Sequence, residues 1–263
     1  MKSYKKNFFT KNKIAIIILV RLNSKRLKKK ALVKLYNISV IELLIKRLLK
    51  DLPKECIFIC TNKNKDSKLK KIAKKNFVNY FEGSEKNIFK RIIDLQKVYK
   101  FKHFIRVTGD NPFTNTSAIK KMSSEHVKRC YEYTYTNSLP EGTRPEVISF
   151  EALKKANNLA IDPNSSEYMT YFFKRKIFKR KNVTFKKKNN KQNLFTITLD
   201  TKKDYQNIIN NFSEKELFMS NERILSKICK IKNILINNKG LPKIKTRKYD
   251  VRFKRNLSNK ILA

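Results

Sequence analysis

Two aspartates and one run of basic residues follow three separate apolar segments of this sequence. Asp110 stands in "TGDNP" (108–112), Asp200 stands in "TLDT" (198–201), and the basic run 21–30 follows the apolar segment 14–20. A pair of carboxylates suits Mg²⁺, which keeps several waters and shares phosphate oxygens with a substrate. A basic loop that leads into a helix suits a phosphate chain. The combination predicts phosphoryl-group chemistry that needs no covalent nucleophile.

The basic run offers four side chains that could donate to phosphate oxygens: Arg21, Ser24, Arg26 and Lys30. Each feature also has a less specific interpretation. An aspartate after a strand is usually a turn or helix cap, and a run of lysines is usually a solvated surface. The features are therefore informative only in combination.

Short apolar segments alternate with amphipathic segments, a pattern typical of strands joined by crossover helices. The sequence predicts strands at 14–20, 56–60, 77–81, 103–108, 131–137, 145–149, 183–185 and 195–199. It predicts helices after capping boxes at Ser39–Glu42 and Thr201–Asp204, over 68–75, and after Ser84 as N-cap. Residues 186–193 are expected to form a polar surface loop. The predicted fold class is α/β, with a mainly parallel twisted sheet and helices on both faces.

Ligands of open α/β sheets bind beyond the carboxyl ends of the strands. Asp110, Asp200 and the basic run all stand at such ends in this prediction. We therefore expect the two aspartates, which are ninety positions apart in the chain, to converge on the same cavity as Arg21 and Lys30.

The chain carries 63 Lys and Arg against 21 Asp and Glu, which gives a net charge of +42. Such an excess is typical of proteins that bind nucleic acid or an anionic membrane. The composition also fits AT-rich codon usage, because only four Gly, six Pro and no Trp occur. Since the charge spreads along the whole length, as on a solvated surface, we do not expect nucleic acid as the partner.

Membrane insertion is not expected, because a spanning helix needs about 20 apolar residues and the longest apolar run is far shorter. No signal-peptide cleavage site follows Val20. The four cysteines show no CxxC or metal-type spacing and are expected to be reduced core thiols of a cytoplasmic protein: Cys56, Cys60, Cys130 and Cys229.

Two further groups of residues are expected to be structural. His103 and His126 are the only histidines, at a predicted strand start and a predicted helix end. Tyr131, Tyr133 and Tyr135 alternate along a predicted strand, so they are expected to pack one face of the sheet and not to stack on bases.

The ordered motifs resemble those of the sugar-activating cytidylyltransferases, the family related to spore-coat polysaccharide biosynthesis and to CMP-sugar-acid synthetases. "IAIIILVRLNSKRLKKKAL" (14–32) is similar to the family's nucleotide-binding opening, and "FEGSEKNIFKR" (81–91) and "RVTGDNPFTN" (106–115) are similar to its next two motifs. "EVISFEAL" (146–153), "SEYMT" (166–170) and "TLDTKKDY" (198–205) also match. The matches occur in order over roughly residues 14 to 210 and are specific as a set.

The resemblance implies a Rossmann-like nucleotide-diphospho-sugar transferase (GT-A type) fold over residues 13–212, with residues 213–263 a C-terminal helix and basic tail of unknown role. It implies Mg²⁺-dependent transfer of CMP from CTP to a sugar, with a sugar acid expected, for cell-surface or flagellar glycan. Lys30, Arg21 and Asp110 would be catalytic, and Asp110 and Asp200 would bind the metal. Nucleotide-binding residues would be Arg21, Ser24, Arg26, Lys30, Gly83, Ser84 and Arg106, with Arg106 supporting the Asp110 turn. Asn137, Glu146 and Glu167 would face the sugar, and a homodimer is expected.

The sequence departs from the family pattern at several positions. The family's Gln is Leu19, and its Pro-Gly pair before the lysine is Lys28-Lys29. A glycine-rich turn is replaced by "YNIS" (36–39), and an acidic position before a strand is His103. The backbone must therefore accept side chains where glycine is usual. The alternatives left open are an inactive relative, a basic nucleic-acid-binding protein, and an enzyme for another nucleotide or a neutral sugar.

Overall fold

The computed structural model describes residues 8–24, 26–63, 67–160, 169–185 and 196–236. Residues 1–229 form one compact unit and residues 230–263 form a second. The described part of the second unit is the end of helix α9 (Asn221–Ile236). The domain boundary predicted after residue 212 stays a prediction, and the predicted loop 186–193 lies outside the described residues.

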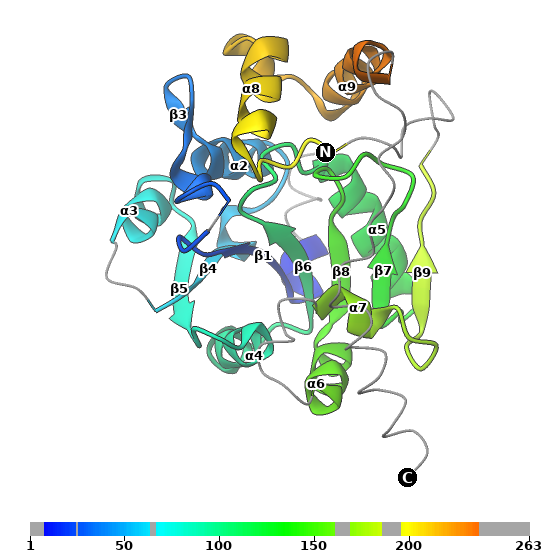
Figure 1. Ribbon diagram of the computed structural model, residues 1–263. Coiled ribbons are helices and arrows are strands. Elements are labelled where there is room, and N and C mark those ends of the chain that lie inside the picture. Colours follow the sequence, from blue (N-terminus) through cyan, green and yellow to red (C-terminus); the bar gives the residue numbers. More distant parts are fainter. Residues whose placement is uncertain (1–7, 25, 64–66, 161–168, 186–195, 237–263) are drawn as a thin grey trace. The chain divides into compact units, whose positions relative to one another are not determined.

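A seven-stranded sheet with the order β5-β4-β1-β6-β8-β7-β9 forms the centre of the first unit (Figure 1). Its strands are β1 (Ile14–Val20), β4 (Ile57–Asn62), β5 (Asn79–Gly83), β6 (His103–Thr108), β7 (Tyr133–Tyr135), β8 (Glu146–Ser149) and β9 (Arg180–Asn182). Strands β5, β4, β1 and β6 are mutually parallel, and β8 runs antiparallel to both β6 and β7. The predicted mainly parallel α/β sheet is confirmed.

Strand β1 lies between β4 and β6, and all seven of its residues are buried. A continuous apolar run is typical of a parallel strand that is covered on both faces. The pairing places Val20 opposite Thr61 of β4 and Leu19 opposite Thr108 of β6. The carboxyl ends of three strands therefore meet at one edge of the sheet, where β1 continues into the basic run.

The helices cover both faces of the sheet. They are α2 (Val40–Leu49), α3 (Lys68–Lys75), α4 (Ile88–Tyr99), α5 (Thr116–Lys128), α6 (Phe150–Leu159), α7 (Met169–Phe173) and α8 (Lys202–Asn211). Side chains of α2, α3 and α5 share one buried cluster with β1, β4 and β6. Helices α4 and α6 lie on the opposite side of the sheet from α2 (Figure 1), where Phe58 of β4 packs against Tyr99 of α4 with ring centroids 4.7 Å apart.

Helix starts follow the local sequence. The Ser39 side chain accepts a hydrogen bond from the backbone N–H of Glu42 and so caps α2. Thr201 and Asp204 form the predicted capping box of α8. These caps satisfy N–H groups that the first helical turn leaves without partners.

Three predicted elements are wrong in detail. Asn87, and not Ser84, is the N-cap of α4, because its side chain accepts from the backbone N–H of Lys90 at 3.0 Å. Residues 183–185 are not a strand, and β9 precedes them at Arg180–Asn182. The predicted strand 195–199 contributes one bridge, Glu141 with Thr196, within its described part.

Residues after 212 contact helix α2 through a buried arginine. Arg47 donates to the carbonyls of Leu217 and Met219, at 3.1 and 2.8 Å, and to the Asn221 side chain at 3.2 Å. Leu217 belongs to a short 3₁₀ helix, η5 (Lys215–Phe218). These bonds tie this segment to the same unit as the sheet.

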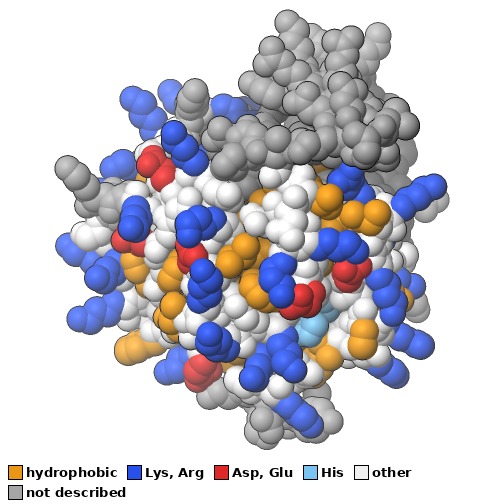
Figure 2. Space-filling model, turned by 90° about the horizontal axis from the view of Figure 1, so that it is seen from below, with side chains coloured by type: hydrophobic (Ala, Val, Ile, Leu, Met, Phe, Trp, Pro, Cys, Tyr) orange, Lys and Arg blue, Asp and Glu red, His pale blue; other side chains and the backbone are white. Residues whose placement is uncertain are grey.

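The surface is basic over a broad area. Figure 2 shows one face on which lysine and arginine side chains are scattered, with acidic and apolar side chains among them. The charge on this face does not form a single stripe of the kind that tracks a nucleic-acid backbone. In the described ranges, no helix has the length and apolar composition to cross a membrane.

The cysteine expectation is partly wrong. Cys56 and Cys60 are buried, Cys229 is half-buried and Cys130 is exposed, so they are not all core thiols. Burial raises the pKa of Cys56 to about 11 and that of Cys60 to about 12. These two thiols therefore remain protonated and unreactive at neutral pH.

The structure agrees with the prediction that the tyrosines of β7 pack a face of the sheet and that the two histidines are structural. Tyr133 is buried and stacks against Tyr135, with ring centroids 5.2 Å apart. His126 is fully buried in α5, where its Nδ1 bonds the Thr134 hydroxyl at 2.8 Å and its ring meets that of His103 edge-on. The positions of both histidines indicate a structural role.

Acid should destabilise the fold through His126. Burial, reinforced by His103, lowers the pKa of His126 to about 3 from its ordinary 6.5. The unfolded chain therefore binds the proton more readily than the folded chain, so stability is lost as pH falls below 6.5. We expect the free energy of unfolding to drop by roughly 2 kcal/mol between pH 6.5 and 4.5 from this group.

Urea unfolding of the intact chain and of His126→Gln at both pH values measures this contribution. The variant should show a smaller loss between the two pH values, because its side chain does not titrate. Equal losses in both proteins would contradict the assignment to His126.

Candidate active site

The basic run forms a loop that closes on itself before a short 3₁₀ helix, η1 (Lys30–Leu32). The Ser24 hydroxyl donates to the Leu27 carbonyl and accepts from the backbone N–H of Lys30 at 3.4 Å. Lys29 has left-handed backbone angles, φ 50° and ψ 36°. This is the position at which the resembling family has glycine, so a side chain occupies a conformation that costs roughly 1 kcal/mol more than it would for glycine.

Asp110 and Asp200 converge on the ammonium group of Lys30, as the sequence predicted. Lys30 Nζ donates to Asp110 Oδ2 and lies 3.0 Å from Asp200 Oδ1. The guanidinium of Arg26 pairs with the other oxygen of Asp200. The carboxyl end of β6, the start of α8 and the basic loop therefore share one site, and its three central side chains are each at most a quarter exposed.

Backbone hydrogen bonds fix both aspartates. The N–H of Gly109 donates to the Leu19 carbonyl of β1 at 2.9 Å, and the N–H of Leu199 donates to the Asp110 carbonyl at 2.9 Å. The segment that carries Asp200 is thereby joined directly to the one that carries Asp110. The Asp204 carboxylate accepts from the N–H of Asp200 at 3.0 Å, so the capping box also holds the aspartate before it.

Gly142 lets the chain pass close to the segment that leads to Asp200. It has φ +87°, and a Cβ atom there would lie 2.6 Å from the backbone nitrogen of Thr198. The backbone N–H of Ile197 donates to the neighbouring Glu141 carbonyl at 2.9 Å. Only glycine combines this backbone angle with such a close approach, so the residue helps to set the path that leads to Asp200.

A hairpin after the basic loop holds the far end of α8. It consists of β2 (Lys34–Leu35) and β3 (Ile38–Ser39), and Tyr36 at its turn has φ 57°. The Tyr36 hydroxyl bonds the Phe212 carbonyl at 2.7 Å, beyond the end of the helix. The helix that follows Asp200 is therefore held at both ends.

The charges of the site favour a protonated Lys30. Burial alone would lower the pKa of Lys30, but Asp110 and Asp200 raise it above 10.5 through their charges and hydrogen bonds. Asp110 Oδ1 is buried with no hydrogen-bond partner. Two carboxylates facing one cation position, with one oxygen unsatisfied, fit a divalent cation that takes its remaining ligands from water and substrate. The described residues contain no group of three or more His, Cys, Asp or Glu side chains that could enclose a metal alone.

Gly83 and Ser84, predicted to lie near the nucleoside, stand at the carboxyl end of β5. Arg91 of α4 is buried and donates to the Ser84 carbonyl at 2.7 and 2.9 Å and to the Glu85 carbonyl at 3.1 Å. Arg91 stands in the motif at 81–91, but no role was predicted for it. The structure shows that it shapes the turn after β5.

Arg106 and Glu146 face each other across β6 and β8, with Arg106 Nη1 2.6 Å from Glu146 Oε2. Glu146 also accepts from the Tyr133 hydroxyl and, at 3.3 Å, from the Thr170 hydroxyl. Burial and the neighbouring Glu146 raise the pKa of Tyr133 well above its usual range. The side chain of Arg106 is therefore engaged with Glu146, and the support predicted for the Asp110 turn is not among its contacts.

The remaining predicted residues are Arg21, Asn137 and Glu167. Arg21 is exposed immediately after β1. The backbone N–H of Asn137 donates to the Asn182 side chain at 3.2 Å, beside β9. Glu167 lies outside the described residues. The sequence did not predict Tyr133 and Thr170 as partners of Glu146. The alternation of tyrosines along β7 was the one signal that placed Tyr133 on a buried face.

Comparison with known proteins gives a consistent result. A family model described as cytidylyltransferase matches residues 15–239. An uncharacterised protein of Methanocaldococcus jannaschii is 32% identical over 200 residues, covering 74% of this chain and 81% of that protein. The spore coat polysaccharide biosynthesis protein SpsF of Bacillus subtilis is 26% identical, covering 75% and 85%.

Among solved structures, a cytidylyltransferase from Leptospira borgpetersenii is similar with a TM-score of 0.76. The match covers 88% of this chain and 99% of that protein at 22% identity. At this identity, the likeness concerns the fold.

Proposed function

This chain belongs to the cytidylyltransferase family, and on that premise we propose that it transfers CMP from CTP to a sugar acid and releases pyrophosphate. The observation that carries the proposal is the convergence of Asp110 and Asp200 on Lys30 beside a basic loop. The fold is that of a nucleotidyltransferase enzyme, and the proposal concerns the substrate and the roles of the residues.

In the proposed reaction, a sugar hydroxyl oxygen attacks the α-phosphorus of CTP and the bond to pyrophosphate breaks. Negative charge accumulates on the phosphate oxygens during this step, and fixed cations lower its energy. Lys30, kept protonated by its neighbours, would bind these oxygens, and Arg21 and Arg26 would hold the outer phosphates. Ser24 would keep the loop in shape through its two hydrogen bonds.

We propose that Asp110 and Asp200 hold Mg²⁺, which would neutralise charge on the triphosphate when bound. The unsatisfied Asp110 Oδ1 supports this assignment. Both aspartates are positioned by backbone hydrogen bonds that do not depend on the ion. These bonds would hold the two residues in position for a cation before the substrate arrives.

We assign Gly83, Ser84 and Arg106 to the wall nearest the nucleoside, and Asn137, Glu146 and Glu167 to the sugar side. The bonds of Glu146 to Arg106, Tyr133 and Thr170 support a rigid wall at this position. The similarity to a spore coat polysaccharide biosynthesis protein supports a product used for surface glycan. We further propose a cytoplasmic homodimer.

The test is pyrophosphate release from purified protein with Mg²⁺, each of the four nucleoside triphosphates, and a panel of sugar acids and neutral sugars. CTP with a sugar acid should give the highest rate. Turnover with another nucleotide or only with neutral sugars would overturn that part of the proposal. An absence of both turnover and CTP binding would overturn it entirely.

A further inference from the structure

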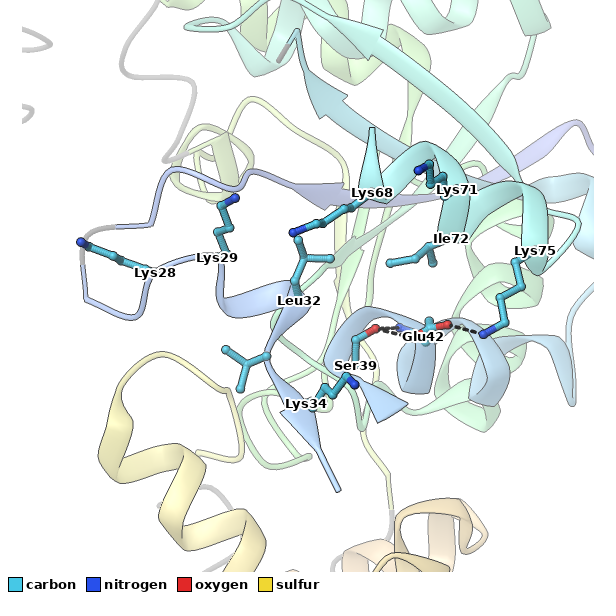
Figure 3. Close-up of a pocket in the computed structure, with 11 residues that line it drawn as sticks. Lys28, Lys29, Leu32, Lys34, Ser39, Glu42, Lys68, Lys71, Ile72 and Lys75 are labelled. Carbon is cyan, nitrogen blue, oxygen red and sulfur yellow. Dashed lines mark hydrogen bonds and ion pairs between the residues drawn. The ribbon is translucent and has the colours of Figure 1, made fainter. Parts of the chain in front are cut away.

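A basic cavity with a volume of about 620 Å³ lies between the basic loop, the hairpin and helix α3 (Figure 3). It is lined by the loop, the hairpin and one side of helices α2 and α3: Lys28, Lys29, Leu32, Val33, Lys34, Ser39, Glu42, Lys68, Lys71, Ile72 and Lys75. None of the residues proposed to bind nucleotide, metal or sugar contributes to this lining. The volume is that of a small-molecule site.

The lysines of this cavity come from three separate segments. Lys68, Lys71 and Lys75 lie with Ile72 at the spacing that places residues on one face of a helix. Lys28 and Lys29 come from the loop, and in Figure 3 the side chain of Lys68 extends toward Leu32. Segments that are distant in sequence therefore contribute lysines to one lining, and all six of these lysines are exposed.

Among the described residues of the lining, the one carboxylate is Glu42, and it is already paired. Glu42 accepts from the Ser39 hydroxyl at 2.7 Å and lies 3.2 Å from Lys75 Nζ. Burial would raise the pKa of Glu42, but these bonds to Ser39 and Lys75 lower it below its usual value. Six lysines and one carboxylate leave a net charge of +5 on the described residues of the lining.

The lining is richer in lysine than the chain as a whole. Lys and Arg make up 63 of 263 residues, or about a quarter, whereas six of the eleven lining residues are lysines. Like charges that converge on one concavity repel each other, and a bound anion removes that cost. Leu32, Val33 and Ile72 add apolar surface between the charges, which suits a compact ligand better than a long extended one.

We propose that this cavity binds a small anion with at least two linked phosphate groups, such as a condensed phosphate or a nucleoside di- or triphosphate. The left-handed Lys29 connects it to the active site, since Lys28 and Lys29 line the cavity while Lys30 contacts Asp110 and Asp200. An anion that binds Lys28 and Lys29 would move the loop and therefore also shift Lys30. The cavity is therefore placed to change turnover as well as to hold a ligand, and the effect on turnover rests on the proposed function.

Calorimetric titration of the full chain with inorganic tripolyphosphate tests the proposal. The wild type should bind two equivalents, one at the active site and one in this cavity. Lys68→Gln with Lys71→Gln should weaken one equivalent at least about tenfold. The matched control is Lys70→Gln with Lys74→Gln, which removes the same charge from exposed positions of α3 outside the lining, and it should retain both equivalents.

A single equivalent in the wild type, or the same loss in both double variants, would overturn the proposal. Displacement of tripolyphosphate by a 20-nucleotide single strand, equally in both variants, would also overturn it, because it would indicate a general polyanion surface. Titration with pyrophosphate, with CTP and with ATP identifies which source of linked phosphates binds best. If the protein has no cytidylyltransferase activity but still binds the second equivalent of tripolyphosphate, the proposed function is refuted and the anion site is supported.

Discussion

Replacement of Asp110 by asparagine is expected to lower kcat for CMP transfer by a factor of about 10³ while the fold is retained. Asparagine has nearly the same shape, so the backbone bonds of Gly109 to Leu19 and of Leu199 to Asp110 should persist. What is lost is one of the two negative charges that face the cation position. The deficit should be largest at low Mg²⁺, because the affinity for the ion falls together with the rate.

Pyrophosphate release measured over a range of Mg²⁺ concentrations checks this expectation, with circular dichroism to confirm folding. The matched control is Asp94→Asn on α4, where the aspartate is ion-paired on the surface with Lys90 and Lys97. That variant should turn over at the wild-type rate. Unchanged activity in Asp110→Asn would refute the assignment of this carboxylate to the metal.

The meeting of Asp110 with the basic loop could be predicted because a general rule of parallel sheets determines it. Val20, Thr108 and the residues that follow them stand at the carboxyl ends of neighbouring strands, so their loops meet at one edge. The continuous apolar run of β1 indicated a central strand. This was enough to place the loops that follow the neighbouring parallel strands at one edge of the sheet. The family motifs then assigned Asp110 and Asp200 to one metal site.

The path to Asp200 was predicted less well, because long-range contacts decide it. The segment "FTITL" (195–199) has strong strand propensity, yet its described part makes only the bridge of Thr196 with Glu141. Bonds from Ile197 to Glu141 and from Leu199 to Asp110 hold it instead. Local propensity cannot reveal partners so distant in the sequence.

Side-chain partners and local caps were predicted least well. Ser84 and Asn87 are both good capping residues three positions apart, and the chain uses Asn87. The pairing of Arg106 with Glu146 depends on the antiparallel register of β6 with β8, which the sequence does not specify. The sequence also predicted that the backbone accepts a side chain where the family has glycine. Lys29 confirms this, because it keeps left-handed backbone angles.

Replacement of Lys30 by glutamine is expected to lower kcat by a factor of about 10² to 10³ and, in contrast to Asp110→Asn, to leave Mg²⁺ affinity unimpaired or improved. Lys30 donates to Asp110 and Asp200, so its ammonium competes with a metal ion for the same oxygens. Its removal leaves two carboxylates facing each other without that positive charge, and a divalent cation then relieves their repulsion. A lysine that served only to hold the two segments together would show the opposite, a loss of both stability and metal affinity.

Mg²⁺ titration by calorimetry, thermal unfolding and single-turnover CMP transfer separate these two roles for Lys30→Gln. Lys46→Gln, which removes one exposed positive charge from α2, is the control for charge alone and should match the wild type in all three measurements. Weaker Mg²⁺ binding in Lys30→Gln with an unchanged rate on saturating Mg²⁺ would show that Lys30 positions the aspartates and does not act on the phosphates. A lower rate together with a higher Mg²⁺ affinity in Lys30→Gln would instead assign the ammonium to the transferring phosphoryl group. Only the loss of a group that acts on the phosphates can lower the rate while it raises the affinity for the ion.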